Sequence, residues 1–424
     1  MKTTTLKTLA ALTCLALLAA ACGEDSDAPV LSDNDDQHNQ ATGADNSGEP
    51  NSQQPGEENS QQPGDEENGD APLLVPEFFD VSDGELSTEV EPELTVIADA
   101  SDNINAPNDL AFHPFEDRSD ELWILNEDST TTGGSTVTLF GAGTADQDAE
   151  WIRDGNAWHF MALPTAIAFG DNGHWATGAG VQDSNHQGGA YSGPSLWSSD
   201  LEIYGVVGDP PTQEVNGSHL DMLHGSPYSM GIAYEHVPDN EWDNAFWVFD
   251  GYHGYPVRYD FHEPHYPGGY DHSNGRIHRY DEIELERHPG LPSHMMIDQE
   301  TGWLYINDTG NQRVLRLNTA TGEMKTNLGI TNEPIAQHWE MHQVEWEVFI
   351  DQGLDSPSGM ALNDGRLFVT DPGTGDLIAY DLETGEELDR VHVGTGIRGI
   401  TIGPDAKLWL ADYDNNRVLR VDPQ

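Results

Sequence analysis

Short apolar runs separated by turn residues recur along most of this chain. One complete unit is residues 291–318, LPSHMMIDQETGWLYINDTGNQRVLRLN, in which apolar runs at 292–297, 303–306 and 314–317 are separated by the turn sequences DQETG and TGNQ. Runs of about four to six β-prone residues bounded by Gly, Asn, Asp and Pro are typical of short antiparallel strands joined by tight turns. One unit therefore predicts three strands of a small sheet.

The same pattern occurs in five further segments, which begin at Ala106, Leu163, Ser226, Ser356 and Gly396. The aligned second strand of each unit ends at a short polar side chain or at glycine: Asn126, Gly178, Asp250, Asp308, Asp371 and Asp412. An Asn or Asp at a strand end accepts hydrogen bonds from nearby backbone amides, so we interpret these residues as structural. Repeats of three or four strands, at a period of about 40 to 70 residues, predict an all-β fold, the β-propeller.

The turn after the second strand carries a more specific motif, DTGNQRV at 308–314 and DYDNNRV at 412–418. It resembles the NHL repeat of six-bladed β-propellers, which implies a six-bladed NHL-type β-propeller over residues 85–424 and speaks to fold more than to function. The last unit supplies only three strands, and residues 85–100 belong to no unit. We therefore expect Glu93 to Ala98 to complete the final blade and close the ring.

The N-terminal residues predict export and a lipid anchor. Residues 1–21 carry two lysines and then an apolar run too short to span a bilayer as a helix, which is typical of a secretory signal. The sequence AAAC at 19–22 resembles the bacterial lipoprotein box, which implies lipidation at Cys22 and, with Gly23 after it, an outer-membrane location in the cell envelope. The polar, acidic composition of the rest of residues 22–84 predicts a disordered linker.

The net charge of the chain limits the classes of partner that it can bind. The chain has 75 Asp and Glu against 17 Lys and Arg, a net charge of −58 at pH 7. Such a field disfavours nucleic acid and anionic lipid surfaces, so membrane contact is expected through the lipid anchor only. The acidity is either an adaptation to salty surroundings or a cation-binding surface, and the scatter of the acids over all units favours the first. The chain has two cysteines, and none follows Cys22, so we expect no disulfide in the propeller.

Histidines are concentrated in residues 217–294, which hold ten of the eighteen: His219, His224, His236, His253, His262, His265, His272, His278, His288 and His294. Part of this region, residues 252–282, is too long and irregular for one hairpin and predicts a large loop on one face. Long loops on a rigid ring are common binding sites, here for a small-molecule, peptide or protein ligand. Each single histidine we interpret as a hydrogen-bonded residue of the loop surface.

Three histidines are distinguished by their place in the repeat. His159, His224 and His294 fall near the expected starts of the innermost strands of successive units, which line the axis of a propeller. Neutral imidazoles that converge on one axis suit zinc or another divalent metal, and three protein ligands leave a position open for water or substrate. We therefore predict that these three residues bind one ion in the axial channel.

Two family resemblances bear on this site. The sequences HGSP at 224–227 and FDGY at 249–252 resemble the peptidyl-α-hydroxyglycine α-amidating lyase, another six-bladed propeller with a histidine-bound axial zinc. This resemblance implies a catalytic role for Tyr252, whereas His294 stands one residue out of step with the family's Pro-His. The sequence PND at 107–109 resembles the metal-binding segment of gluconolactonase-type propellers.

Two classes of function follow from these observations. The first is a monomeric, exported, lipid-anchored propeller that binds a ligand or a protein on its loop-rich face. The alternative is a metal-dependent lyase or hydrolase, with the axial histidines as ligands and Tyr252 as acid, base or orienting group. A role in envelope assembly is a third hypothesis. Metal analysis of protein purified without a nickel column separates the first two.

Overall fold

A computed structural model describes residues 93–206, 217–238, 240–330 and 333–422. The predicted secretory signal at 1–21, the lipidated Cys22 and the linker at 22–84 lie outside the described residues. Within the described part, no helix is long and apolar enough to cross a membrane.

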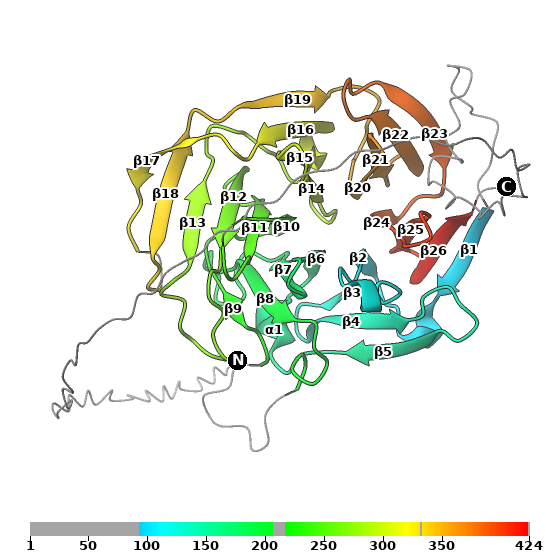
Figure 1. Cartoon of the computed structure of the whole chain (residues 1–424), viewed down its shortest axis with the longest axis horizontal. Helices are drawn as coiled ribbons and strands as arrows, with labels where there is room; N and C mark the ends of the chain where they lie inside the picture. Colours follow the sequence, from blue (N-terminus) through cyan, green and yellow to red (C-terminus); the bar gives the residue numbers. More distant parts are fainter. Residues whose placement is uncertain (1–92, 207–216, 239, 331–332, 423–424) are drawn as a thin grey trace, which may run out of the picture. The chain divides into compact units, whose positions relative to one another are not determined.

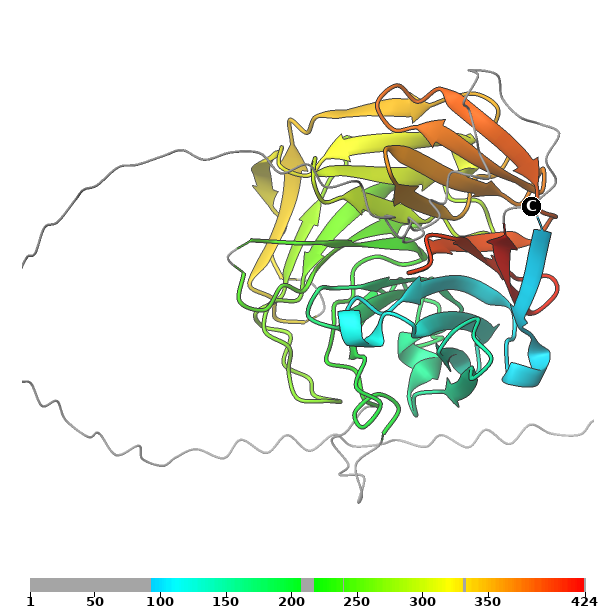
Figure 2. The ribbon, with the colours of Figure 1, turned by 45° about the vertical axis from the view of Figure 1, so that its right-hand side comes forward.

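Six sheets are arranged around one axis, and the first strand of each sheet lies innermost (Figure 1). The inner strands are β2 (Pro107–Phe112), β6 (Pro164–Phe169), β10 (Ser229–Glu235), β14 (Met295–Asp298), β20 (Met360–Asn363) and β24 (Ile397–Ile402). We number the sheets as blades 1 to 6 in this order. The predicted six-bladed β-propeller is therefore confirmed, and Figure 2 shows its sheets in an oblique view, turned by 45° from that of Figure 1.

Three blades have the plain four-stranded form, in which each strand pairs antiparallel with the one before it along the chain. Blade 1 continues through β3 (Leu122–Ser129), β4 (Gly133–Phe140) and β5 (Asp148–Ile152), and blade 2 through β7 (His174–Ala179), β8 (Pro194–Ser198) and β9 (Asp221–Met222). Blade 5 continues through β21 (Arg366–Asp371), β22 (Asp376–Asp381) and β23 (Glu387–His392).

The two ends of the propeller meet in blade 6. After β24 come β25 (Leu408–Asp412) and β26 (Arg417–Asp422), and the outermost strand is β1 (Glu93–Ala98) from the other end of the chain. β1 pairs antiparallel with β26, with Glu93 opposite Asp422 and Val96 opposite Leu419. The hydroxyl of Thr95 also donates a hydrogen bond to Asp422 at 2.6 Å. The closing strand expected at Glu93 to Ala98 is confirmed.

Blade 3 is larger than the repeat predicts. It continues through β11 (Ala245–Asp250), β12 (Tyr255–Asp260) and β13 (Arg276–Arg279), and is then extended by β18 (Gln337–His342) and β17 (Glu323–Asn327). This last hairpin lies in the sequence between β16 (Arg313–Asn318) and β19 (Trp346–Ile350), the outer strands of blade 4, whose second strand is β15 (Trp303–Asp308). β18 pairs parallel with β13. An insertion in blade 4 therefore becomes the outer edge of blade 3.

The prediction of one large loop at residues 252–282 is wrong. These residues include β12 and β13, and the loop between them covers only 261–275. Val257, Tyr259 and Ile277 are completely buried, so the segment does alternate between inward apolar and outward polar side chains. The surrounding Tyr, His and Pro residues obscure this short period in the sequence, whereas burial against the neighbouring strands stabilises it.

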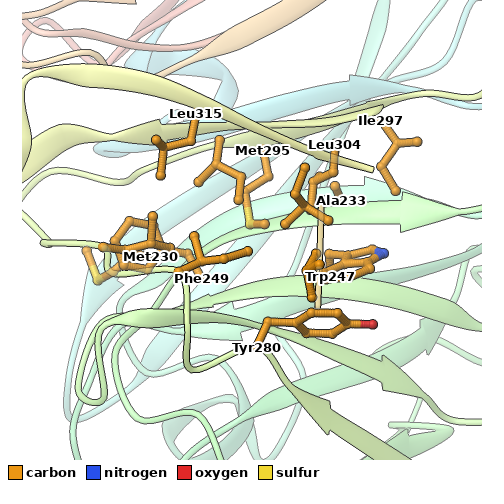
Figure 3. Packing of buried hydrophobic residues seen from close by; sticks show 14 of the residues in the cluster. Met230, Ala233, Trp247, Phe249, Tyr280, Met295, Ile297, Leu304 and Leu315 are labelled. Atoms are coloured by element: carbon orange, nitrogen blue, oxygen red, sulfur yellow. The ribbon is translucent and has the colours of Figure 1, made fainter. Parts of the chain in front are cut away.

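Apolar side chains on facing blades form the core between them. Figure 3 shows Trp247 and Phe249 of blade 3 facing Met295, Leu304 and Leu315 of blade 4. Each of these side chains is at most 2% exposed, and burial of one such group stabilises the fold by about 1.5 to 3 kcal/mol. The blades are thus held by packing, as expected for a domain without a disulfide.

The acidic residues at the strand ends have the structural role expected of them. Asp308 accepts hydrogen bonds from the Glu286 amide at 2.7 Å and from Nε of Arg313 at 2.8 Å. Asp371 likewise accepts from the amides of Asp355 and Ser356 at 2.7 and 3.0 Å. Through these hydrogen bonds the two buried carboxylates fix the position of the segments that lead into blades 4 and 5.

Candidate functional site

His294 comes directly before the inner strand β14 and contacts the inner strands of two other blades. Its Nε2–H donates to the carbonyl oxygen of Thr165 in β6 at 3.0 Å, and its Nδ1 lies 3.5 Å from Oδ1 of Asp109 in β2. Asp109 in turn accepts a hydrogen bond from the Ile167 amide at 2.9 Å, and burial raises the pKa of its carboxyl group. His294 therefore links the inner strands of blades 1, 2 and 4.

A second polar group at the axis surrounds Arg398 of β24. Its Nη1 donates to Oδ1 of Asn108 at 2.7 Å, and its guanidinium lies 3.2 Å from the centroid of the Tyr413 ring. Asn108 donates through Nδ2 to Glu127 at 2.9 Å, and Glu127 also accepts from the Tyr413 hydroxyl at 3.1 Å. The Asn and Asp of the PND segment are thus engaged in hydrogen bonds with protein groups.

His159 and His224 lie close together but are held differently from His294. His159 is in the short helix α1 (Ala157–Phe160), not in a strand, and its Nδ1 donates to the Ser184 carbonyl at 3.3 Å. Its ring centroid is 5.6 Å from that of His224, which stacks on Tyr191 at 3.7 Å. The structure brings His159 and His224 together, whereas His294 contacts Asp109 and Thr165. An ion shared by all three stays a prediction.

Tyr252 lies in the turn between β11 and β12 with half of its surface exposed. Its amide donates to the Pro227 carbonyl and to Oδ1 of Asp250, both at 3.1 Å, and its ring meets His253 edge-on at 5.0 Å. These contacts fix the backbone of the turn. The catalytic role of Tyr252 stays a prediction.

A cavity of about 350 Å³ lies beside His159 and His224, and we call it the histidine cleft. Side chains from five separate segments line it, among them Trp158, His159, Tyr191, Tyr270, His272 and Glu333. These segments are α1, the loop between β7 and β8, β9, the loop between β12 and β13, and the connection between β17 and β18. The histidine cleft is thus formed by loops of blades 2 and 3 together with the insertion of blade 4.

Buried hydrogen bonds fix the segments that form the histidine cleft. Asp154 accepts from the amide of Asn156, just before α1, at 2.7 Å, and from the Ser218 amide at 2.8 Å. Asp183 accepts from the amides of Gln187 and Gly189, both at 2.8 Å, which shapes the loop that carries Tyr191. Short loops of this kind become rigid when their backbone amides are satisfied by one carboxylate.

Two further contacts bring in the distant segments. The His265 amide donates to the Leu220 carbonyl at 3.0 Å, so the loop at 261–275 runs beside the residues that lead into β9. Glu333 accepts from both the amide and Nδ1 of His224, at 2.9 and 3.1 Å, across 109 positions of sequence. The insertion of blade 4 therefore reaches the histidine cleft through Glu333.

The electrostatics of the histidine cleft favour an ionised carboxylate beside neutral imidazole. Burial would raise the pKa of Glu333, but its hydrogen bonds from His224 outweigh burial and lower that pKa. Burial and the neighbouring His224 lower the pKa of His159 to about 4, so this ring is neutral at pH 7. Burial also raises the pKa of Tyr191 to about 12, which keeps its hydroxyl protonated.

A buried pair lies next to these residues. Nδ1 of His272 is 2.7 Å from Oδ1 of Asp221, the first residue of β9. Burial raises the pKa of Asp221 to about 6. Burial opposes protonation of His272, but the hydrogen bond to Asp221 and the charge of that carboxylate outweigh it and raise the pKa of His272.

The described residues include two groups with the spacing of metal ligands, each with its ligand atoms within 4.8 Å of one another. One group is Asp221, His265 and His272, of which Asp221 and His272 are buried. The other is Asp171, His236 and Asp243, which lies toward solvent. His159, His224 and His294 do not form a third such group among the residues that the structure describes.

Sequence reasoning missed Asp221, Tyr191 and Glu333. His265 and His272 were noticed only as members of the histidine-rich region. The density of histidine there was the one available signal, because Asp221 and His272 are 51 positions apart and no spacing rule joins them. Glu333 comes from an insertion whose pairing with blade 3 nothing in the repeat indicates.

No family model matches this chain, and no curated protein matches it. Several solved propellers are similar in fold. An auxiliary nutrient binding protein from Bacteroides ovatus has a TM-score of 0.47 at 12% identity, covering 79% of this chain and 78% of that one. Virginiamycin B lyase from Staphylococcus aureus has a TM-score of 0.43 at 11% identity, and the match covers 79% of this chain and 100% of that one. Regucalcin from Agrobacterium tumefaciens has a TM-score of 0.45 at 14% identity, and the match covers 80% of this chain and 96% of that one. At these identities the likeness concerns the fold alone.

Proposed function

We propose that this chain is a binding propeller that holds a small organic cation in the histidine cleft. The observation that supports this most directly is the presence of exposed aromatic rings beside an ionised carboxylate. Trp158 and Tyr270 expose 39% and 55% of their surface, and Glu333 lines the same cavity. Aromatic faces next to a carboxylate favour a positively charged group, because the ring quadrupole and the charge both attract it.

The charge of the whole chain supports the same ligand class. A net charge of −58 raises the local concentration of cations at the surface and speeds their association, more strongly at low salt. His159 is neutral at pH 7 and does not oppose this attraction. Concave sites with mainly aromatic walls and a few oriented polar groups are the usual form of small-molecule sites.

Choline and 3,3-dimethyl-1-butanol, which have the same shape and differ in charge, test the proposal. We expect choline to change the tryptophan fluorescence of the full chain in a saturable way and the alcohol to fail. Trp158→Ala and Glu333→Gln should each weaken choline binding at least about tenfold, or about 1.4 kcal/mol. Trp151→Ala is the matched control, since Trp151 is 41% exposed and lies outside the histidine cleft. Equal binding of both probes, or none, would overturn the assignment.

We further propose that the protein is exported and held in the bacterial envelope, at the outer membrane, by lipid on Cys22. This proposal rests on the sequence of residues 1–22. Cys22→Ser should move the exported protein from the membrane fraction to the soluble fraction, since no later stretch of sequence is long and apolar enough to span. Retention in membranes after a high-salt wash would contradict it.

A metal-dependent lyase or hydrolase is the second candidate, with His159, His224 and His294 as zinc ligands and Tyr252 in a catalytic role. The closeness of the His159 and His224 rings favours it. In that case His294→Ala should remove the ion. A metal content that is unchanged by His294→Ala would exclude the axial form of the site.

A further inference from the structure

We propose that Asp221, His265 and His272 bind one divalent transition-metal ion in the wall of the histidine cleft. This site is separate from the three histidines that the repeat singles out. It rests on contacts of its own and does not depend on the organic cation proposed above.

The hydrogen bonds of His265 leave one ring nitrogen ready for a metal. Its Nδ1 lies 2.7 Å from the carbonyl oxygen of Tyr266, so Nδ1 carries the hydrogen and Nε2 carries the lone pair. That Nε2 is buried and has no hydrogen-bond partner among the described residues. A backbone acceptor that fixes the tautomer of a ligating histidine is the usual arrangement around metal ions.

Asp221 presents a matching oxygen. Its side chain is completely buried, and its Oδ1 accepts from the Met222 amide and from Nδ1 of His272, both at 2.7 Å. Its other oxygen, Oδ2, is buried without a hydrogen-bond partner in the part of the chain that the structure describes. An unpaired buried acceptor is costly, and a shared cation would satisfy one in each of two residues whose ligand atoms lie within 4.8 Å of each other.

The geometry allows the three residues to share an ion. One ligand atom from each lies within 4.8 Å of the others, whereas tetrahedral zinc needs about 3.4 Å between ligand atoms. His265 and His272 both stand on the loop at 261–275, so a small shift of this loop or of their side chains would be needed for the three residues to close around zinc.

The ligand set selects the class of ion. Two imidazole nitrogens and one carboxylate oxygen suit zinc and other first-row divalent ions, whereas calcium prefers six to eight oxygens. His272 also lines the cavity, so an ion at this site would have positions open toward it. A zinc ion and choline in one small cavity repel each other, so zinc should weaken choline binding.

The solvent-exposed group provides a matched control. Nδ1 of His236 already lies 3.0 Å from Oδ2 of Asp243, which also accepts a hydrogen bond from the Tyr234 hydroxyl. Its ligand atoms therefore satisfy one another. The exposed group and the proposed site each consist of three His and Asp residues. His236→Ala therefore removes one histidine from the exposed group and leaves the proposed site unchanged.

The experiment uses the full chain purified without an oligohistidine tag, stripped with chelator, and titrated with zinc chloride or calcium chloride by calorimetry. We expect one zinc per chain, a higher melting temperature with zinc and no response to calcium. Asp221→Asn and His265→Gln should each weaken zinc binding at least about tenfold, and His236→Ala should leave it unchanged.

Each other outcome argues against the proposal. Absence of stoichiometric zinc would show that water satisfies Asp221 and His265. Zinc that is lost in His236→Ala, or in His294→Ala, would place the ion in the exposed group or at the axis. Asp221→Asn and His265→Gln alter different segments. If one of these two variants fails to fold, zinc binding by the other decides the result. Choline binding without zinc binding would leave the first proposal standing and overturn this one.

Discussion

The polar side chains at the axis and those in the wall of the histidine cleft differ in the kind of atom they leave unpaired. At the axis, Arg398 bonds to Asn108, and His294 bonds to Thr165 and contacts Asp109. The buried Nε of Arg398, which has no hydrogen-bond partner among the described residues, is a donor, whereas the unpartnered buried atoms of Asp221 and His265 are acceptors. The axial groups therefore hold blades together, whereas the groups of the cleft wall remain available to a ligand.

The origin of the two groups explains the difference. The axial residues lie in or next to inner strands, whose positions the ring fixes. The residues of the cleft come from loops, from the short strand β9 and from an insertion, and such segments are free to vary while the ring persists. Place in the repeat is thus a guide to structural contacts, whereas the residues that we propose to bind a ligand lie where the chain departs from the repeat.

The largest expected effect comes from removing the strand that closes the ring. A chain that starts at residue 101 lacks β1, leaves β26 as an unpaired edge and opens the blade that carries Arg398. We expect cooperative thermal unfolding to be lost, as followed by circular dichroism and calorimetry. A shortened chain that melts like the full one would show that blade 6 does not need β1, and that the axial contacts survive in an open ring.

The next effect separates the two regions directly. Arg398→Met removes the donor to Asn108 and leaves the buried polar groups of the axis unpaired, so unfolding free energy should fall by about 3 kcal/mol. Choline and zinc binding should not change. Lys325→Met is the control, because its ion pair with Glu340 is exposed and should contribute little to stability. Urea denaturation measures both, and equal losses would contradict a structural role specific to the axis.

A smaller effect is expected from Asp221→Asn in metal-free protein. Asparagine keeps an acceptor for His272 and for the Met222 amide, and the pKa of Asp221, raised by burial to about 6, shows that its charge is already costly there. Unfolding free energy in the presence of chelator should change by less than about 1 kcal/mol. A loss as large as that of Arg398→Met would make Asp221 a structural residue like those at the axis.

The smallest effect is a difference in pH dependence. The folded pKa of His159 is about 4, below its unfolded value near 6.5, so between these values the unfolded chain binds more protons. This histidine therefore costs no stability above about pH 6.5 and destabilises the fold increasingly as the pH falls to about 4. As the pH falls through this range, the melting temperature of His159→Gln should therefore decrease less than that of the wild type. Parallel curves would show that His159 titrates normally in the folded protein.

The amino-acid sequence by itself determined the ring. Strand length, turn residues and the Asp and Asn residues at strand ends are local features that recur from blade to blade, with Gly178 in place of the acid or amide in blade 2, so the repeat predicted six blades. The strand at Glu93 to Ala98 could be assigned because a closed ring leaves no other partner for β26. Hydrophobic alternation also existed at β12 and β13, but Tyr, His and Pro obscured it.

Only the tertiary structure decided which side chains meet in the histidine cleft. Glu333 reaches His224 because the insertion between β16 and β19 pairs with β13, a parallel contact that no local propensity encodes. Asp221 and His272 meet because the loop at 261–275 runs beside the segment before β9. Such contacts depend on packing between distant segments, where burial and satisfied backbone groups select one arrangement, and the sequence pattern carries information only about each segment alone.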